Sequence, residues 1–80
     1  MPELTTHQLL SAVSKVEKVN HIKLDKLTQI ISDNPQQALD TFTALVGLES
    51  MDDRFKYIVN SQPHLQSEMP HLLETSVLLG

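Results

Sequence analysis

Apolar residues recur at three- and four-residue spacings along almost the whole chain, which is the period of an amphipathic α-helix. Thr5, with Gln8 three residues on, forms a capping box at the start of the first set. A second apolar set follows Asn20-His21. The first set is Leu9, Ala12, Val13, Val16 and Val19, and the second is Leu24, Leu27, Ile30 and Ile31.

The two sets lie nearly in phase on a helical wheel. Residues 6–32 are therefore compatible with one continuous helix or with two helices joined at Asn20-His21. Asn is a common helix terminator and a Val-rich run is a weak helix former. We therefore expect two helices.

The third segment has clear start and stop signals. Ser32-Asp33-Asn34-Pro35 is a polar cap with a proline at the first helical position, and Gly47 with Leu48 is typical of a Schellman-type end. Ser50 then caps a fourth helix, which carries acidic residues in its first turn. The faces expected to be buried are Leu39, Phe42, Leu45 and Val46 on the third helix, and Met51, Phe55, Ile58 and Val59 on the fourth.

The last segment, from Pro63 to Gly80, is again helical in pattern but contains Pro70. Because proline removes a backbone hydrogen bond, either a short turn over 64–68 precedes a helix that starts at Pro70, or one helix is kinked there. No stretch has the alternation of a strand. We predict an all-α fold, a small bundle of four to five short helices, forming a single helical domain over 1–80.

Composition narrows the class of protein. The chain has no cysteine, no tryptophan and a net charge of −4, so it is a small acidic protein with a mainly aliphatic core. Residues 1–27 carry a charge of +1, and residues 28–80 carry −5. No targeting segment or membrane span is visible, which leads us to expect a cytoplasmic protein with no membrane contact.

Candidate chemistry is sparse. His64, Glu68 and His71 have the i, i+4, i+7 spacing that lets side chains on one helix share a metal ion, but no second such motif exists. We interpret them as surface side chains and expect no metal and no cofactor. The two glycines, 33 residues apart, form no phosphate-binding loop, and no serine or threonine has an evident activating base. We therefore expect no enzymatic activity and no small-molecule substrate.

DNA binding through a helix-turn-helix is the alternative function. Its reading helix would be residues 36–46, where Gln36 and Gln37 have the amides that bind adenine edges. That segment contains no Lys or Arg, although phosphate contacts supply most of the binding energy. Nucleic acid is thus an unlikely partner.

The apolar character of the last helix favours protein–protein interaction. Leu72, Leu73, Leu78 and Leu79 exceed what one end helix buries in its own core, and the lysines of the first helix offer an electrostatic complement. We therefore predict an adaptor, chaperone-like protein or inhibitor that forms a homodimer or receives a partner helix. The predicted contact residues are Leu72, Leu73, Leu78, Leu79, Lys15 and Lys18.

Overall fold

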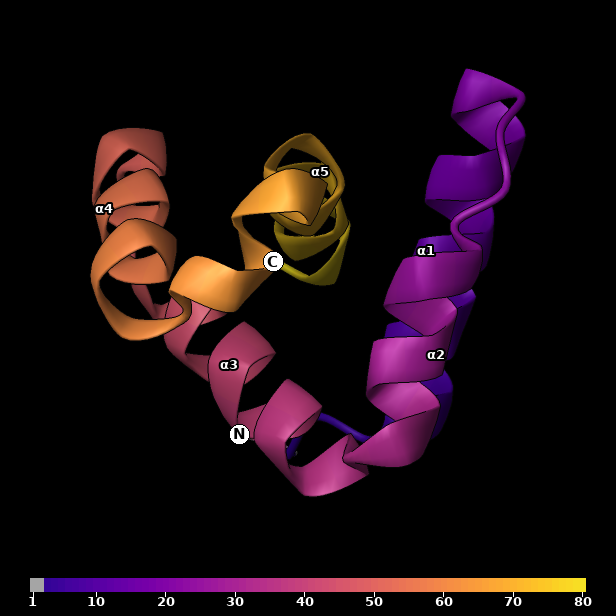
Figure 1. The fold of residues 1–80 in the computed structure, drawn as a ribbon, viewed down its shortest axis with the longest axis horizontal. Helices are drawn as coiled ribbons and strands as arrows, with labels where there is room; N and C mark the ends of the chain where they lie inside the picture. The colour runs from indigo at the N-terminus through magenta and orange to yellow at the C-terminus, as the bar shows by residue number, and fades with distance from the viewer. Residues whose placement is uncertain (1–2) are drawn as a thin grey trace.

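The computed structural model describes residues 3–80, which form five α-helices and one 3₁₀ helix (Figure 1). None of these residues lies in a strand, so the predicted all-α fold is confirmed. The elements are α1 (Thr6–Asn20), α2 (Asp25–Asp33), α3 (Pro35–Gly47), α4 (Met51–Ser61), the 3₁₀ helix η1 (Pro63–Glu68) and α5 (Met69–Leu79).

The predicted capping box starts α1. The Thr5 hydroxyl accepts from the backbone N–H of Gln8 at 3.1 Å, and the Gln8 side chain accepts from the Thr5 backbone N–H at 3.0 Å. The expected stripe is buried at Leu9, Ala12, Val13 and Val16. Val19 was expected on that stripe, but it is 70% exposed; it lies about 100° around α1 from Asn20, which contacts α5.

His21 ends α1 and settles the choice between one helix and two. Its backbone is left-handed, with φ 55° and ψ 43°, and this breaks the helical path before α2 begins. The His21 N–H donates to the carbonyl of Lys18, and the Ile22 N–H donates to that of Glu17. This pair of bonds is a Schellman motif, so the prediction of two helices is confirmed.

The connection between α2 and α3 is a single residue, Asn34. Its side chain accepts from the backbone N–H of Gln37, which caps α3, and Pro35 occupies the first turn as predicted. The Schellman end expected at Gly47 was wrong. Gly47 has no positive φ and ends the helix itself, and the Leu48 N–H donates to the carbonyl of Leu45 instead.

Ser50 caps α4 as predicted, since its hydroxyl accepts from the N–H of Asp53. The structure also resolves the alternatives around Pro70. η1 is a separate short helix, and α5 begins at Met69 with Pro70 in its first turn. Backbone N–H groups in the first turn have no acceptor within the helix, so the N–H that proline lacks removes no helical hydrogen bond there.

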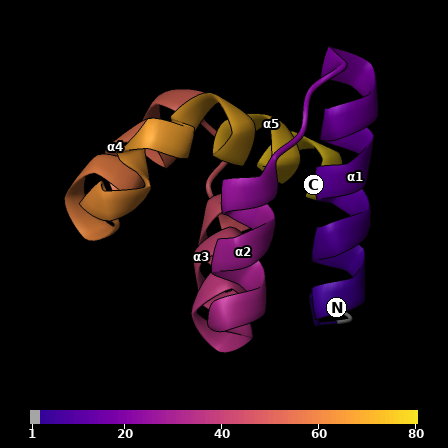
Figure 2. The ribbon, with the colours of Figure 1, turned by 45° about the vertical axis from the view of Figure 1, so that its right-hand side comes forward.

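One core joins the helices (Figure 2). Of all helix pairs, α1 and α5 share the most extensive contact, and α5 also packs on α3 and α4. The Asn20 amide donates both to the carbonyl of Val16 and to the carboxylate of Glu74, each at 2.9 Å, and so joins α1 to α5. Side chains with almost no exposed area include Leu9, Val16, Leu27, Ile31, Phe42, Leu45, Ile58 and Leu72.

Candidate interaction surface

A nearly buried arginine joins α4 to α5 and to the end of α3. Arg54 is 8% exposed; its Nε donates to the carbonyl of Leu48 at 2.7 Å, and its Nη1 donates to the Ser76 hydroxyl at 2.9 Å. Both acceptors lie at the carboxyl end of a helix, where the backbone carbonyls carry partial negative charge. Arg54 therefore ties together two helix ends that favour a cation.

Three apolar side chains close in sequence to the two ends of this link are exposed. Met51 and Phe55 on α4 are 42% and 45% exposed, and Val77 on α5 is 55% exposed. Since Arg54 is bonded to Ser76, each of these residues lies within one helical turn, about 5.4 Å along its axis, of the link. We call Met51, Phe55 and Val77 the α4–α5 apolar cluster.

Met51 and Phe55 were expected to be buried, and that prediction was wrong. The side of α4 that faces the other helices is occupied by Arg54 and Ile58, which are both buried. Phe55 follows Arg54 by about 100° on the helix, so it lies at the edge of this side. The buried side of α4 is therefore rotated toward Arg54 relative to the predicted stripe, and no local pattern in the sequence indicates that rotation.

Acidic residues surround the α4 part of the cluster. Glu49, Asp52 and Asp53 are all exposed, and Asp52 pairs with Lys56 at 3.0 Å. The hydrogen bond and charge of Asp52 raise the pKa of Lys56 above its ordinary value. Three carboxylates against Lys56 and the nearly buried Arg54 leave a net charge of −1 over residues 49–56. We call Glu49, Asp52 and Asp53 the acidic rim.

The predicted contact leucines have different environments. Leu72 is fully buried in the core, because its side of α5 faces the other helices. Leu73 and Leu79 are partly buried and pack on the core. Leu78 is 48% exposed, about 200° around α5 from Ser76 and therefore on the far side from the link to α4.

The predicted lysine face is exposed on α1. Lys15 and Lys18 both face solvent. Lys18 lines an open hollow with Ile22 and Lys23 at the end of α1, whereas Lys15 does not. Leu4 and Ile22, two apolar residues outside the predicted apolar sets, also differ: Leu4 packs on the core, and Ile22 is 37% exposed.

The histidine–glutamate spacing does not become a cluster. His64 and Glu68 lie in η1, whereas His71 lies in α5, so the three residues are not on one regular α-helix. Within residues 3–80 there is no group of three or more His, Asp or Glu side chains placed to hold a metal ion. A pocket of about 220 Å³ beside His64 is smaller than the roughly 300–1,000 Å³ typical of small-molecule sites.

The geometry around α3 differs from a helix-turn-helix. Such motifs connect their helices through three or four residues, but only Asn34 separates α2 from α3. The amide of Gln36 donates to Asp40, and the side-chain oxygen of Gln37 accepts from Asn34. The two residues proposed to bind bases are thus engaged within their own helix.

Searches of protein-family models, curated proteins and solved structures give no significant match to this chain. Within residues 3–80, no helix has the length and apolar character required to cross a bilayer. The functional argument therefore rests on the surface itself.

Proposed function

We propose that the chain is a small non-enzymatic protein–protein interaction module that binds through the α4–α5 apolar cluster. One observation carries the proposal: Met51 and Phe55 on α4 and Val77 on α5, which lie within one turn of the bonded residues Arg54 and Ser76 along their helices, each leave about half of the side chain exposed. Contiguous apolar side chains within a polar border are typical of protein interfaces.

The cluster is large enough to contribute measurably to binding. The three exposed fractions together equal about one and a half complete side chains. At about 1.5–3 kcal/mol for each fully buried large apolar side chain, covering them contributes about 2–4 kcal/mol. A few residues of this kind commonly dominate an interface, and aromatic residues are prominent among them.

A titration with a designed peptide tests the proposal. The probe is a helix of about 18 residues, five turns, with a leucine stripe on one face and glutamine and serine on the other. Amide chemical shifts of the labelled protein should change at Met51, Phe55 and Val77. Covering the exposed 45% of Phe55 is worth about 0.7–1.4 kcal/mol, so Phe55→Gln should weaken binding about 3- to 10-fold.

Val19→Gln is the matched control, because Val19 is 70% exposed and lies on α1. It should leave the affinity within about twofold of the original, since surface changes away from the contact cost under about 0.5 kcal/mol. The proposal would be refuted if the Phe55→Gln variant bound the peptide as tightly as the original chain and still showed shift changes at the cluster. So would the absence of any shift at millimolar peptide, or shifts confined to other helices.

A further inference from the structure

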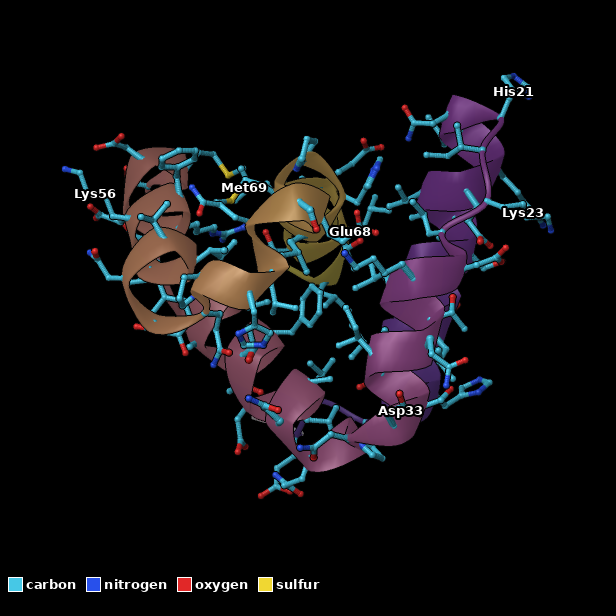
Figure 3. All side chains as sticks on the ribbon, in the orientation of Figure 1. His21, Lys23, Asp33, Lys56, Glu68 and Met69 are labelled. Carbon is cyan, nitrogen blue, oxygen red and sulfur yellow. The ribbon has the colours of Figure 1, made fainter. Side chains whose placement is uncertain are left out.

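One of the two lysines predicted to contact a partner belongs to a second surface, at the turn between α1 and α2. An open hollow of about 570 Å³ is lined there by Lys18, Ile22 and Lys23, together with Ser14, Glu17 and His21. In Figure 3 the side chains of His21 and Lys23 point outward from this end of the molecule. We call the six lining residues the basic hollow.

The basic hollow combines an apolar side chain with two positive charges that have no ionic partner. Ile22 is 37% exposed, and Lys18 and Lys23 are exposed. Among residues 3–80 the one ion pair joins Lys56 to Asp52, so neither lysine of the hollow has a carboxylate within 4.0 Å. Because covering an unpaired ammonium group is costly, an occupant that covers Ile22 must bring anionic groups to the lysines.

The carboxylates nearest to the hollow are engaged with other groups. Glu17 is half-buried, and its carboxylate accepts from a backbone N–H of the turn at 2.8 Å. Glu74 of α5 accepts from the Asn20 amide at 2.9 Å. Asn20 lies about 200° around α1 from Lys18, so Glu74 is on the opposite side of that helix from the lysine.

The turn carries a positive surplus on an acidic molecule. Counting every charge, residues 14–26 contain four lysines and two carboxylates, a net charge of +2, so the remainder of the chain carries −6. The α4–α5 apolar cluster, by contrast, lies beside the acidic rim, where residues 49–56 have a net charge of −1. An anionic partner is therefore attracted to the hollow and repelled from that cluster.

We propose that the basic hollow binds an acidic segment of another protein, in which an aliphatic side chain lies between carboxylates. The aliphatic side chain covers Ile22, and the carboxylates pair with Lys18 and Lys23. The exposed hydroxyl of Ser14 supplies a further hydrogen-bond donor. This surface is separate from the α4–α5 apolar cluster, so the inference goes beyond the proposed function and does not rest on it.

The lining residues favour an acidic peptide over other anions. Single-stranded nucleic acid stacks its bases on aromatic side chains, but no Phe, Tyr or Trp lines the hollow. A helix that lies on a membrane inserts a continuous apolar face, whereas the apolar stripe of α1 is buried in the core and Ile22 is the one large apolar side chain of the hollow. A free phosphate ion has no apolar part with which to cover Ile22.

The test is an NMR titration of the labelled protein with a peptide of about eight residues, at most about 29 Å long, whose single leucine is flanked by glutamates on both sides. Amide shifts should change at Lys18, Ile22 and Lys23. The shift of Phe55 should stay constant. Lys18→Gln with Lys23→Gln should weaken binding about 2- to 30-fold, the range expected for losing two exposed ion pairs.

A second substitution tests the apolar part of the contact. Ile22→Gln should weaken binding about 3- to 6-fold, because the peptide leucine no longer covers the 37% of Ile22 that is exposed. With serine in place of the peptide leucine, Ile22→Gln should change the affinity by less than about twofold, since no apolar contact is left to lose.

The matched control for charge is Lys26→Gln with Lys56→Gln, which removes two lysines that do not line the hollow. It lowers the net charge of the chain by the same amount and should leave the affinity within about twofold of the original at about 0.15 M salt, where the Debye length is about 8 Å. Lys18→Glu with Lys23→Glu should reject the glutamate peptide and bind a version with lysines in place of the glutamates. Circular dichroism establishes that each variant remains helical.

Several results would overturn the inference. Equal weakening by the control pair would show that only the net charge of the chain matters, and equal affinity for a glutamine version of the peptide would show that the charges contribute nothing. Equal shift changes with inorganic phosphate would make the hollow a general anion site. Binding to phosphatidylserine vesicles but not to the peptide would assign it to a membrane surface. The absence of any shift at millimolar acidic peptide would also reject the inference, yet the proposed function would stand if the neutral helical peptide still binds at Phe55.

Discussion

Arg54 provides the sharpest stability test in this structure. Replacing it with methionine keeps an unbranched apolar chain in the same place and removes both donors. The carbonyl of Leu48 then loses the bond at 2.7 Å, whereas the Ser76 hydroxyl still donates to the carbonyl of Leu73. One partly buried acceptor is left without a partner.

A buried polar group without its partner costs about 1–3 kcal/mol, and we expect Arg54→Met to reduce the free energy of unfolding by this amount. The loss is large for a small domain, because at about 0.05–0.15 kcal/mol per residue a chain of 80 residues has a total of about 4–12 kcal/mol. Urea unfolding followed by circular dichroism measures it. With a slope of about 1 kcal/mol per molar urea, the midpoint should fall by about 1–3 M.

Two further variants distinguish the loss of the Arg54 hydrogen bonds from the loss of a positive charge. Lys56→Met removes a neighbouring cation whose ion pair is exposed, and it should leave the urea midpoint nearly unchanged. In a Ser76→Ala background, Arg54→Met should cost about 0.5–1.5 kcal/mol less than in the original chain, because the two side chains are bonded. If Arg54→Met matches Lys56→Met, the reasoning about this link is wrong.

Three other changes test the helix ends and the surface ion pair. His21→Gly should stabilise the chain by about 0.5–1 kcal/mol, measured by urea unfolding, because glycine adopts the left-handed backbone without strain; an equal or lower stability would contradict this. Thr5→Ala should cost about 1 kcal/mol in the same assay through loss of the cap, and an unchanged midpoint would show that the capping box contributes nothing. Asp52→Asn should lower the pKa of Lys56 toward 10.5 in an NMR titration. The contribution of this pair is present at neutral pH and is lost above about pH 10.5, but both side chains are exposed, so unfolding at neutral pH should be nearly unaltered; a pKa that stays raised would refute the assignment to Asp52.

Local signals along the sequence predicted the helix starts well. Thr5, Asn34 and Ser50 accept backbone N–H groups at helix starts, because a cap depends only on residues two or three positions away. α3 ends at Gly47 as expected, but the left-handed Schellman geometry predicted there is found at His21, where the chain turns between α1 and α2. The path of the chain therefore places the left-handed backbone at His21, although glycine adopts this conformation more readily than histidine.

Exposure was harder to predict, since it depends on which helix covers which face. Val19, Met51 and Phe55 follow the helical period of buried residues, yet no other helix covers them. Conversely, Thr75 and Ser76 are fully buried although they are polar. Their hydroxyls donate to carbonyls three or four residues earlier in α5, which satisfies them within their own helix.

The candidate surface was located only in part. The apolar pattern of the last helix led us to expect exposed apolar side chains there. Val77 and Leu78 on that helix are exposed, whereas Leu72 lies in the core. The decisive contact joins Arg54 to Ser76 across 22 positions, and no periodicity within one helix reveals a bond between two.

The extensive contact between α1 and α5 has a consequence for how the chain folds. α2 and α3 can pack as soon as both exist, because their contacts are local in sequence. The bond from Asn20 to Glu74 spans 54 positions, so it must close a long loop before it contributes. We therefore expect α1 to remain unprotected from hydrogen exchange until α5 has docked. The side of α1 that packs on α5 would stay solvated during synthesis until most of the chain has left the ribosome.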